Sequence, residues 1–276
     1  MKRLAFLSFI LAGVSGAFAQ TFSMKSGETV PASEFVRNGD MLMVTVKSAS
    51  GGSGQVGYHI SDVASLNLPE PDVMVFASEQ LQNKEYQNAL NQILPVVAFQ
   101  KTIRDIPGNW WAKAALLEAS ALIGLNRVDD ATALVTEISS YANDPEILTA
   151  AKLQIALITK YTDPKQAMAA YDDILSHSSD AKTLSQAWIA EGDVHFSEHE
   201  FDEALMAYLT VTVFYPEHNP FLPKALFGSG QSYAKLKDTA NATKVYNSLI
   251  ANFPESPEAP LARAELAEIK KKENKT

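Results

Sequence analysis

The sequence predicts a mainly α-helical protein: a solenoid of about five helix pairs with a capping helix, preceded by a small β module. A small residue recurs every 36 to 42 positions in the longer, C-terminal part of the chain. In that part the apolar residues follow the helical period, whereas before residue 69 they alternate or form short β-branched runs. The segment Leu68-Pro69-Glu70-Pro71 separates the two parts.

The composition restricts the classes of function. With 46% hydrophobic and 20% charged residues, the 276-residue chain is typical of a globular protein, which excludes a disordered chain. The absence of cysteine excludes disulfides, thiolate catalysis and cysteine-bound zinc or iron–sulfur clusters. The chain has 23 basic and 32 acidic residues and a formal charge of −9. This balance argues against a nucleic-acid partner, because such binding relies on Lys and Arg.

Residues 1–19 have the features of an export signal peptide. A positive start is followed by an apolar run, and Ala17-Phe18-Ala19 places small residues before a cleavage site between Ala19 and Gln20. The run is too short to span a membrane, and polar residues interrupt every later apolar run. Residues 11–13 resemble the start of a bacterial lipobox, but Val14 stands where the acylated cysteine would be. We therefore expect a periplasmic or secreted protein with no lipid anchor and no transmembrane segment.

Residues 20–68 predict a small β module of four or five short strands, in a barrel or hairpin arrangement, followed by a linker at 69–71. Apolar or alternating runs occur at 21–24, 35–37, 41–46 and 56–60, with turn residues between them. Asn38-Gly39 lies between two of these runs and is typical of a tight hairpin, because both residues tolerate a positive φ.

Helical repeats occupy residues 72–270. A small residue early in the second helix of each pair recurs at spacings of 42, 36, 37 and 38 residues, as Ala89, Ala131, Ala167, Ala204 and Ala242. Another small residue lies 12 positions before four of these alanines, as Ala77, Ala119, Gly192 and Gly230. Small residues let paired helices approach closely, while bulky residues fill the gaps between them.

The last two repeats agree at further positions. Gly192 is followed by Phe201-Asp202-Glu203-Ala204, Tyr208 and Tyr215-Pro216, and Gly230 by Tyr233, Ala242, Tyr246 and Phe253-Pro254. This pattern resembles the tetratricopeptide repeat (TPR), in which small residues, an aromatic residue and a terminal proline recur in each helix pair. The resemblance covers roughly residues 72–266 and implies a right-handed TPR-like solenoid.

The segment from Tyr246 to Pro257, followed by Ala259 and Ala262, is similar to repeats of bacterial envelope TPR proteins of the outer-membrane-assembly and Tol–Pal-associated types. That resemblance implies a periplasmic protein–protein adaptor rather than an enzyme. It also exposes a difference, because the outer-membrane-assembly member is anchored through a lipidated cysteine, whereas this chain has Val14.

Three features depart from a regular array. Pro95 falls inside the second helix of the first pair, which should kink or end there. In the third pair Ile155 occupies the expected small position, and residues 161–164 break the helices. A final helix at 261–270 should cover the last pair, as solenoid ends require, and is followed by a basic tail at 271–276. Lysines there complement the helix dipole; contact with an acidic partner or a membrane surface is the alternative.

His195 and His199 form the only metal-like spacing, at i and i+4 with Glu191 one turn earlier. The pair falls where the first helix of the fourth repeat ends, so a packing role for His195 and a turn position for His199 compete with a metal site. Gly228-Ser229-Gly230 lacks the frame of a nucleophile elbow. We expect no catalytic residue, no metal and no cofactor.

Trp110 and Trp111 are adjacent, so on a helix their side chains point about 100° apart and cannot enter one core together. We expect one of them to fill the gap between the first two repeats. The other is a candidate exposed aromatic for protein or sugar contact, although packing of both in the core is an open alternative.

The concave face, formed by the first helix of each pair, is the predicted partner-binding surface. Apolar anchors ringed by polar groups suit a groove that holds a peptide or a helix, although the same residues could pack against neighbouring helices. The predicted residues are Leu116, Ile123, Gln186, Ile189, Asp193, Phe196, Lys224, Phe227, Gln231 and Lys235, together with Met74, Ser78, Leu81, Lys113 and Ser120.

The leading hypothesis is therefore an exported, non-enzymatic adaptor that binds a protein or peptide partner in the cell envelope through its concave face. The alternative is a self-associating structural component, or one associated with peptidoglycan or another glycan, that uses Trp110, Trp111 and the β module. A metal-dependent enzyme at His195 and His199 is the third hypothesis.

Overall fold

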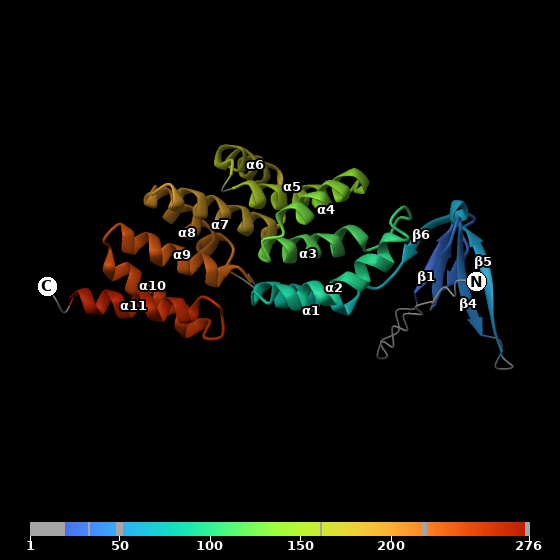
Figure 1. Ribbon diagram of the computed structural model, residues 1–276, viewed down its shortest axis with the longest axis horizontal. Helices are drawn as coiled ribbons and strands as arrows, with labels where there is room; N and C mark the ends of the chain where they lie inside the picture. Colours follow the sequence, from blue (N-terminus) through green and yellow to red (C-terminus); the bar gives the residue numbers. More distant parts are fainter. Residues whose placement is uncertain (1–19, 33, 48–51, 161, 217–219, 274–276) are drawn as a thin grey trace. The chain divides into compact units, whose positions relative to one another are not determined.

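The computed structural model describes residues 20–32, 34–47, 52–160, 162–216 and 220–273. The chain divides into two compact units, which Figure 1 shows coloured along the sequence. The first unit comprises Met1–Pro69 and the loop Ile106–Asn109, and the second comprises Glu70–Asp105 and Trp110–Thr276. The predicted signal peptide at 1–19 lies outside the described residues. The expected fold class, mainly helical with a small N-terminal β module, is confirmed.

The first unit contains six short strands within its described residues, arranged in two three-stranded antiparallel sheets. The strand orders are β2-β1-β6 and β3-β4-β5. The predicted runs correspond to four of the strands, while β2 and β6 had no separate prediction. The bounds are β1 Thr21–Met24, β2 Thr29–Pro31, β3 Phe35–Asn38, β4 Met41–Lys47, β5 Ser53–His59 and β6 Val63–Asn67, with a 3-10 turn at Ile60–Asp62 before β6.

The two sheets share a small apolar core. Phe22 of β1 and Phe35 of β3 meet edge to face, with their ring centroids 4.8 Å apart. The loop 106–109 is part of this unit because the backbone amide of Leu66 donates to the carbonyl of Pro107 at 2.7 Å. Gly108 takes a φ of +85°, and a Cβ there would lie 1.9 Å from the Leu66 carbonyl oxygen. Only glycine therefore allows this loop to approach β6.

The β3–β4 connection has the predicted tight form but a different centre. Asn38 pairs with Met41, so the two central residues are Gly39 and Asp40 instead of Asn38 and Gly39. Gly39 alone of the two takes a positive φ, of +62°. A positive φ at only the first central position is the geometry of a type II′ turn, which accepts glycine there and places no such demand on the next residue.

The second unit contains eleven helices within the described residues, which follow one another as five pairs and a final helix (Figure 1). Consecutive helices pack against each other throughout. No helix in the described ranges is long and apolar enough to cross a membrane. The bounds are α1 Asp72–Gln82, α2 Tyr86–Lys101, α3 Trp111–Gly124, α4 Val128–Tyr141, α5 Pro145–Thr159, α6 Pro164–His177, α7 Ala181–Ser197, α8 Phe201–Phe214, α9 Leu222–Lys235, α10 Thr239–Asn252 and α11 Ala259–Glu273.

The two helices of a pair are joined by a tight turn with a left-handed residue. This residue is Lys84, Asn126, His199 or Lys237 in the first, second, fourth and fifth pairs, with φ between +59° and +69°. Such a residue closes the last turn of the first helix and redirects the chain into the second. His199 therefore occupies a turn, as one of the two interpretations of the histidine pair predicts.

Small residues face aromatic rings where the helices of a pair meet. A Cβ on Gly192 would lie 2.8 Å from the Tyr208 ring, and one on Gly230 would lie 2.5 Å from the Tyr246 ring. Tyr208 also faces Gly228 of the next pair, where an added Cβ would lie 2.6 Å from the ring. The ring of the second helix thus fills the space that a glycine of the first helix leaves. The five recurrent alanines, Ala89, Ala131, Ala167, Ala204 and Ala242, are all buried.

The first and third pairs depart from the pattern in different ways. The sequence predicts a kink or an end at Pro95; helix α2 does not end there but continues to Lys101, so the second of these alternatives is wrong. The turns that α2 adds beyond Pro95 bury Val97 and Gln100, and this tertiary packing outweighs the hydrogen bond that proline cannot donate. In the third pair, α5 ends at Thr159 and α6 begins at Pro164, so the helices break where the sequence predicts. Asp163, for which no such role was predicted, is the N-cap of α6.

Helix α11 closes the C-terminal end of the stack. Its buried residues Ala262, Leu266 and Ile269 pack against Tyr246 and Leu249 of α10 in one apolar cluster. The predicted capping role of this helix is borne out by these contacts, and the helix is longer at both ends than predicted.

The odd-numbered helices form the inner layer of the solenoid. Each of them from α1 to α7 contacts the next odd-numbered helix as well as its neighbours in sequence. Contacts between the first helices of successive pairs indicate the inner side of a curved stack, where the path is shorter. The candidate site lies on this side.

Candidate binding site on the inner face of the solenoid

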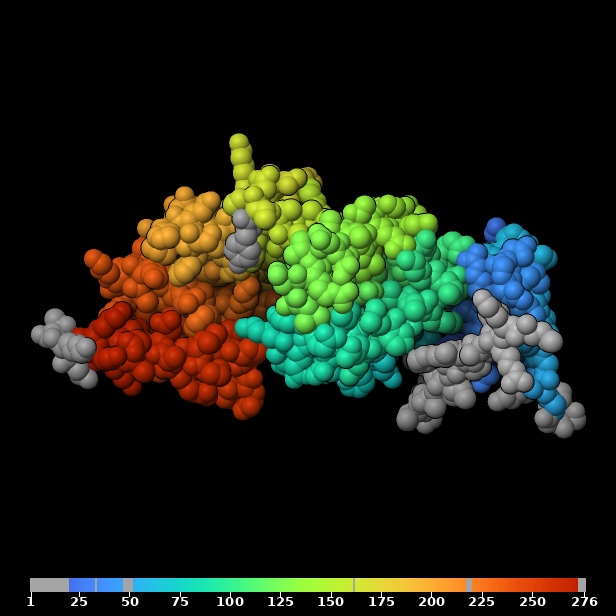
Figure 2. All heavy atoms as spheres, viewed as in Figure 1, coloured from blue at the N-terminus to red at the C-terminus, as the bar shows by residue number. Residues whose placement is uncertain are grey.

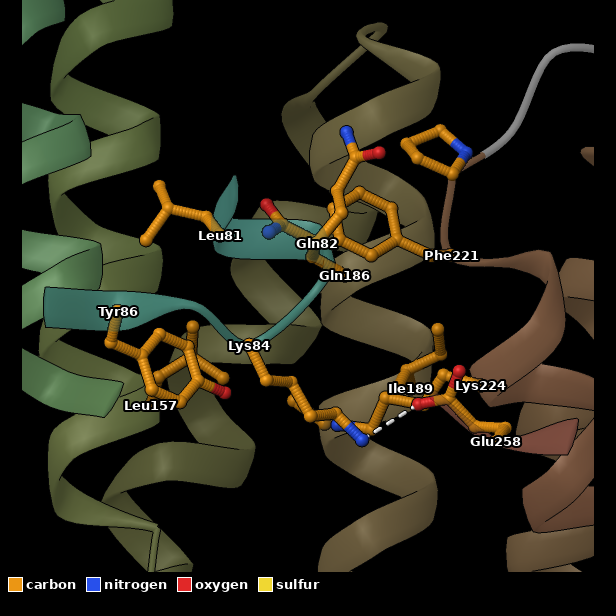
Figure 3. A pocket seen from close by; sticks show the side chains of 12 residues that line it. Leu81, Gln82, Lys84, Tyr86, Leu157, Gln186, Ile189, Phe221, Lys224 and Glu258 are labelled. Carbon is orange, nitrogen blue, oxygen red and sulfur yellow. Dashed lines mark hydrogen bonds and ion pairs between the residues drawn. The ribbon is translucent and has the colours of Figure 1, made fainter. Parts of the chain in front are cut away.

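A cavity of about 310 Å³ lies on the inner side of the helical unit (Figure 3). Its walls come from places far apart in the sequence: the α1–α2 turn, α5, α7, the start of α9 and the loop before α11. The lining residues are Leu81, Gln82, Lys84, Tyr86, Leu157, Gln186, Ile189, Ala190, Pro220, Phe221, Lys224 and Glu258.

The cavity combines apolar and amide groups. Ile189 is buried in the core between α7 and α8, while Leu157 and Phe221 are half-buried, so carbon surface remains exposed to the cavity. Gln82 and Gln186 supply side-chain amides, each of which can both donate and accept hydrogen bonds. A site of this composition can hold an apolar side chain and hydrogen-bond the backbone that carries it.

A charged network supports the wall formed by α7 and α9. One oxygen of Asp193 lies 3.0 Å from Lys160 Nζ and 3.1 Å from Lys224 Nζ. Its other oxygen accepts a hydrogen bond of 2.9 Å from the hydroxyl of Tyr208. Burial would raise the pKa of Asp193, but Lys224 and Lys160 outweigh it and hold the pKa below its usual value. The carboxylate therefore stays ionised and fixes Lys224 at the edge of the cavity.

A second ion pair joins the two ends of the helical unit. Lys84 Nζ, in the α1–α2 turn, lies 2.9 Å from Glu258 Oε1, immediately before α11 (Figure 3). The two residues are 174 positions apart. In Figure 2 the C-terminal part of the chain, drawn in red, meets the edge of the segment that contains α1 and α2. The cavity is therefore bounded on one side by a contact between the first and last repeats.

The structure brings three of the ten predicted concave-face residues to the cavity wall, namely Gln186, Ile189 and Lys224, and Leu81 from the wider prediction joins them. Asp193 lies behind this wall and holds Lys224. The others line no part of this cavity: Leu116, Ile123, Phe196, Phe227, Gln231 and Lys235.

Packing explains where several of these residues lie. The rings of Phe196 and Phe201 meet edge to face, with centroids 5.3 Å apart, and the centroids of Phe227 and Tyr246 are 5.9 Å apart. Phe196 and Phe227 therefore both take part in helix packing. Leu116 and Ile123 pack against the apolar clusters of the first two pairs. For these four residues the competing interpretation, packing against neighbouring helices, describes the observed contacts.

Sequence reasoning missed the residues that lie in turns and loops. Lys84, Phe221 and Glu258 line the cavity but stand outside the interiors of the first helices on which the prediction was based. One signal was available for Phe221, because a large aromatic residue between Pro220 and Pro223 precedes a helix start. No sequence signal links Lys84 to Glu258.

The tryptophan pair is not an exposed platform. Trp111 is 1% exposed and meets Tyr141 edge to face at 5.8 Å, so the hypothesis of an exposed aromatic is wrong for this residue. Its indole fills the space among the first helix pairs, as expected for one of the two. Trp110 is half-buried, packs on the same cluster and lies under Lys113, with Nζ 5.2 Å from its ring centroid.

The histidine pair is engaged in local contacts. His195 Nδ1 lies 2.7 Å from Glu200 and Nε2 lies 3.7 Å from Glu191, so the ring bridges α7 to the start of α8. His199 Nδ1 lies 3.1 Å from the carbonyl of Ser197 in the turn. Burial raises the pKa of Glu191, with His195 opposing the shift. Across the described residues, no group of three or more His, Asp or Glu side chains is arranged to hold a metal ion.

One protein-family match identifies a repeat in the chain. Residues 224–256, which cover most of α9, all of α10 and part of the following loop, match the family model described as tetratricopeptide repeat. This match agrees with the sequence pattern of the fifth pair and supports the TPR resemblance. No curated protein matches the chain.

Two solved structures of TPR proteins match part of the chain. YrrB, described as a TPR protein with an unusual peptide-binding site, has 16% sequence identity and a TM-score of 0.39, covering 70% of this chain and 90% of that chain. A Podosopora anserina protein with nearly identical TPR-like repeats of a putative kinesin light chain has 15% identity and a TM-score of 0.42. That match covers 65% of this chain and 92% of the other. Both scores are below 0.5, so we base no assignment on them.

Proposed function

We propose that this protein is a non-enzymatic adaptor that binds an extended segment of a partner protein in the inner cavity of its helical solenoid. The observation that carries the proposal is the cavity itself, in which Ile189, Leu157 and Phe221 surround space next to the amides of Gln82 and Gln186. The TPR match at 224–256 supports the same class of function.

An extended peptide suits this cavity better than a compact small molecule with many charges. The charged groups at the wall are already neutralised by one another, with Lys84 on Glu258 and Lys224 on Asp193. The groups available to a ligand are therefore apolar surface and amides, which match a peptide backbone with an apolar side chain. Because Lys84, Glu258 and Lys224 are engaged in these ion pairs, they are better suited to supporting the cavity wall than to transferring a proton to a ligand.

We propose further that the protein acts in the periplasm of the bacterial envelope, beside partners of the kind used by outer-membrane-assembly or Tol–Pal-associated proteins. The support is the sequence of residues 1–19 and the likeness of Tyr246 to Pro257 to such repeats. Cell fractionation followed by mass determination of the isolated chain tests this. A periplasmic product that begins at Gln20 is the expected result, and a cytoplasmic product that keeps residues 1–19 would contradict it.

Site-specific photo-crosslinking in intact cells tests the binding surface. A photoreactive phenylalanine at Phe221, in the cavity wall, should yield an adduct with a partner protein. The matched control is the same substitution at Phe214, which is 73% exposed on α8 but lies outside the cavity. Adding Leu157→Lys, which places a charged chain in the cavity, should abolish the adduct at position 221. Adducts at position 214 alone, or an adduct at 221 that persists with Leu157→Lys, would overturn the proposal.

A further inference from the structure

The contact between the two ends of the helical unit is unusual for a solenoid. Repeat proteins are held together mainly by contacts between neighbouring repeats. Here Lys84 of the first pair meets Glu258 of the last, across 174 positions of sequence. We propose that this ion pair is a latch that closes the inner cavity, and that ligands enter when it opens. The proposal rests on the cavity that the proposed function uses.

The chemistry of the pair favours a closed state at rest. The Glu258 side chain is only 8% exposed, whereas that of Lys84 is 46% exposed. A carboxylate so far removed from water needs a partner, and Lys84 is the partner that the structure provides. Closure therefore satisfies Glu258, while the lysine can return to solvent at low cost.

The backbone holds Lys84 ready for this contact. Its φ is +62°, and the turn is fixed because the Lys84 amide donates to the Leu81 carbonyl and the Glu85 amide donates to the Gln80 carbonyl. At the other end, Glu258 precedes α11, and its carbonyl accepts the amide of Ala262 at 2.9 Å. Both partners thus stand on rigid helix ends, and only the two side chains must meet.

Little else joins these two ends. Within the described residues, neither α1 nor α2 shares an extended packing surface with α9, α10 or α11. Separation of the ends would break the ion pair and widen the cavity, without disrupting the helix pairs that flank it. A small relative displacement of neighbouring repeats is enough, because each repeat adds its own small rotation to the curvature.

Thiol accessibility in the full chain measures this opening without a ligand. The chain has no cysteine, so Gln186→Cys places a single thiol in the cavity wall. In this background, Lys84→Met should raise the rate of reaction with fluorescein-5-maleimide at least threefold, because it keeps the alkyl chain but removes the charge. Raised ionic strength should accelerate the reaction in the parent and have little effect in Lys84→Met.

The matched control is Lys237→Met. Lys237 is also exposed and occupies the same left-handed turn position in the fifth pair, with a φ of +65°. It does not line the cavity, so its substitution should leave the rate unchanged. An unchanged rate in Lys84→Met, or an equal acceleration in Lys237→Met, would overturn the latch.

Charge reversal separates opening from damage to the fold. Lys84→Glu should open the cavity by repulsion, and Lys84→Glu combined with Glu258→Lys should restore the slow rate. Failure of the double variant to restore it, with circular dichroism of the helices unchanged, would contradict the ion pair as the closing element. These measurements need no peptide. A latch that works with no adduct at Phe221 would reject the proposed function alone, and an adduct at Phe221 without a latch would reject only this inference.

Discussion

Gly192, Gly228 and Gly230 each lie against a tyrosine ring, and a Cβ at any of the three positions would overlap that ring. These glycines lie inside α7 and α9, although glycine disfavours a helix relative to alanine by about 1 kcal/mol. The cost is offset because a tyrosine ring of an adjacent helix occupies the space: Tyr208 of α8 faces Gly192 and Gly228, and Tyr246 of α10 faces Gly230. The small residues predict a close approach of adjacent helices, and the structure shows that this approach leaves no room for a Cβ at these glycines.

We predict that Gly230→Ala destabilises the helical unit. The added Cβ would lie 2.5 Å from Cε1 of Tyr246, a fully buried ring with no room to move. Overpacking of this kind costs about 1–3 kcal/mol, which exceeds the gain of about 1 kcal/mol in helix propensity. Urea unfolding should show a net loss of up to about 2 kcal/mol. Gly54→Ala is the control, since no atom lies within 4 Å of its Cβ; equal stability of the two variants would refute the explanation.

Asp193 stabilises the fold through three neighbours, namely Lys160, Lys224 and Tyr208. Asp193→Asn should destabilise the protein at neutral pH by about 3–5 kcal/mol, because it removes the poorly exposed carboxylate that pairs with both Lys160 and Lys224. Tyr208→Phe removes one hydrogen bond to the same carboxylate and should cost about 1 kcal/mol. Urea midpoints at pH 7 measure both changes. A smaller loss in Asp193→Asn than in Tyr208→Phe would contradict the assigned role.

The same carboxylate gives a pH dependence with a defined sign. Its pKa is lower in the folded than in the unfolded chain, so ionised Asp193 stabilises the fold above the unfolded value of about 3.9. This contribution disappears as the pH falls through the lower folded pKa. The stability difference between the parent and Asp193→Asn should therefore shrink below about pH 4. Asp129→Asn, at an exposed position in the first turn of α4, serves as the control; a constant difference for Asp193→Asn down to pH 2 would contradict the assignment.

At the scale of the helices, side-chain caps determine several starts. Asp180, the N-cap of α7, accepts the amide of Thr183 at 2.7 Å. Asp180→Ala should lower the stability by about 1 kcal/mol, because the amide loses its acceptor. Asp129→Ala in the first turn of α4, where Arg127 is the N-cap without a side-chain bond, should change it far less. Thermal unfolding monitored at 222 nm compares the two, and equal losses would rule out the cap as the cause.

The elements that the sequence predicted well are those in which local and tertiary signals agree. Helices α7 to α10 combine glycine, aromatic and proline positions that each helix pair needs for its own packing. Of the two outcomes predicted at Pro95, a kink or an end, the end does not occur, because burial of the residues beyond it outweighs the local penalty of proline. Strand β2 was missed because it spans only Thr29–Pro31 and has one buried residue, Val30.

At the scale of the whole molecule, the candidate site shows why the sequence predicts only some of the residues that line the cavity. The repeat pattern identifies residues on the inner helices and found Gln186, Ile189 and Lys224. The cavity, however, is completed by Lys84 and Glu258, which meet only after five repeats have accumulated their curvature. Periodicity specifies neighbours of one repeat and carries no information about contacts between the first and the last. Residues in the closing contact therefore require the structure.

The end of the stack gives the last prediction. Leu266 of α11 is 8% exposed and packs on α10, whereas Leu261 of the same helix is 47% exposed. Leu266→Asp removes apolar packing worth about 2–5 kcal/mol and places a charge in the apolar cluster, so α11 should detach. In a solenoid the loss should spread to α9 and α10 and leave α3 and α4 protected, because repeats depend on their neighbours.

Hydrogen exchange with mass spectrometry resolves this difference between helices. Peptides from α10 and α11 should exchange faster in Leu266→Asp than in the parent, and peptides from α3 and α4 should exchange at the parent rate. Leu261→Asp introduces the same charge on the exposed side of α11 and should leave the pattern unchanged. Faster exchange in every helix of Leu266→Asp would show that the unit unfolds as a single cooperative body. In that case the contact between Lys84 and Glu258 would join a rigid ring, and the cavity would open only on global unfolding.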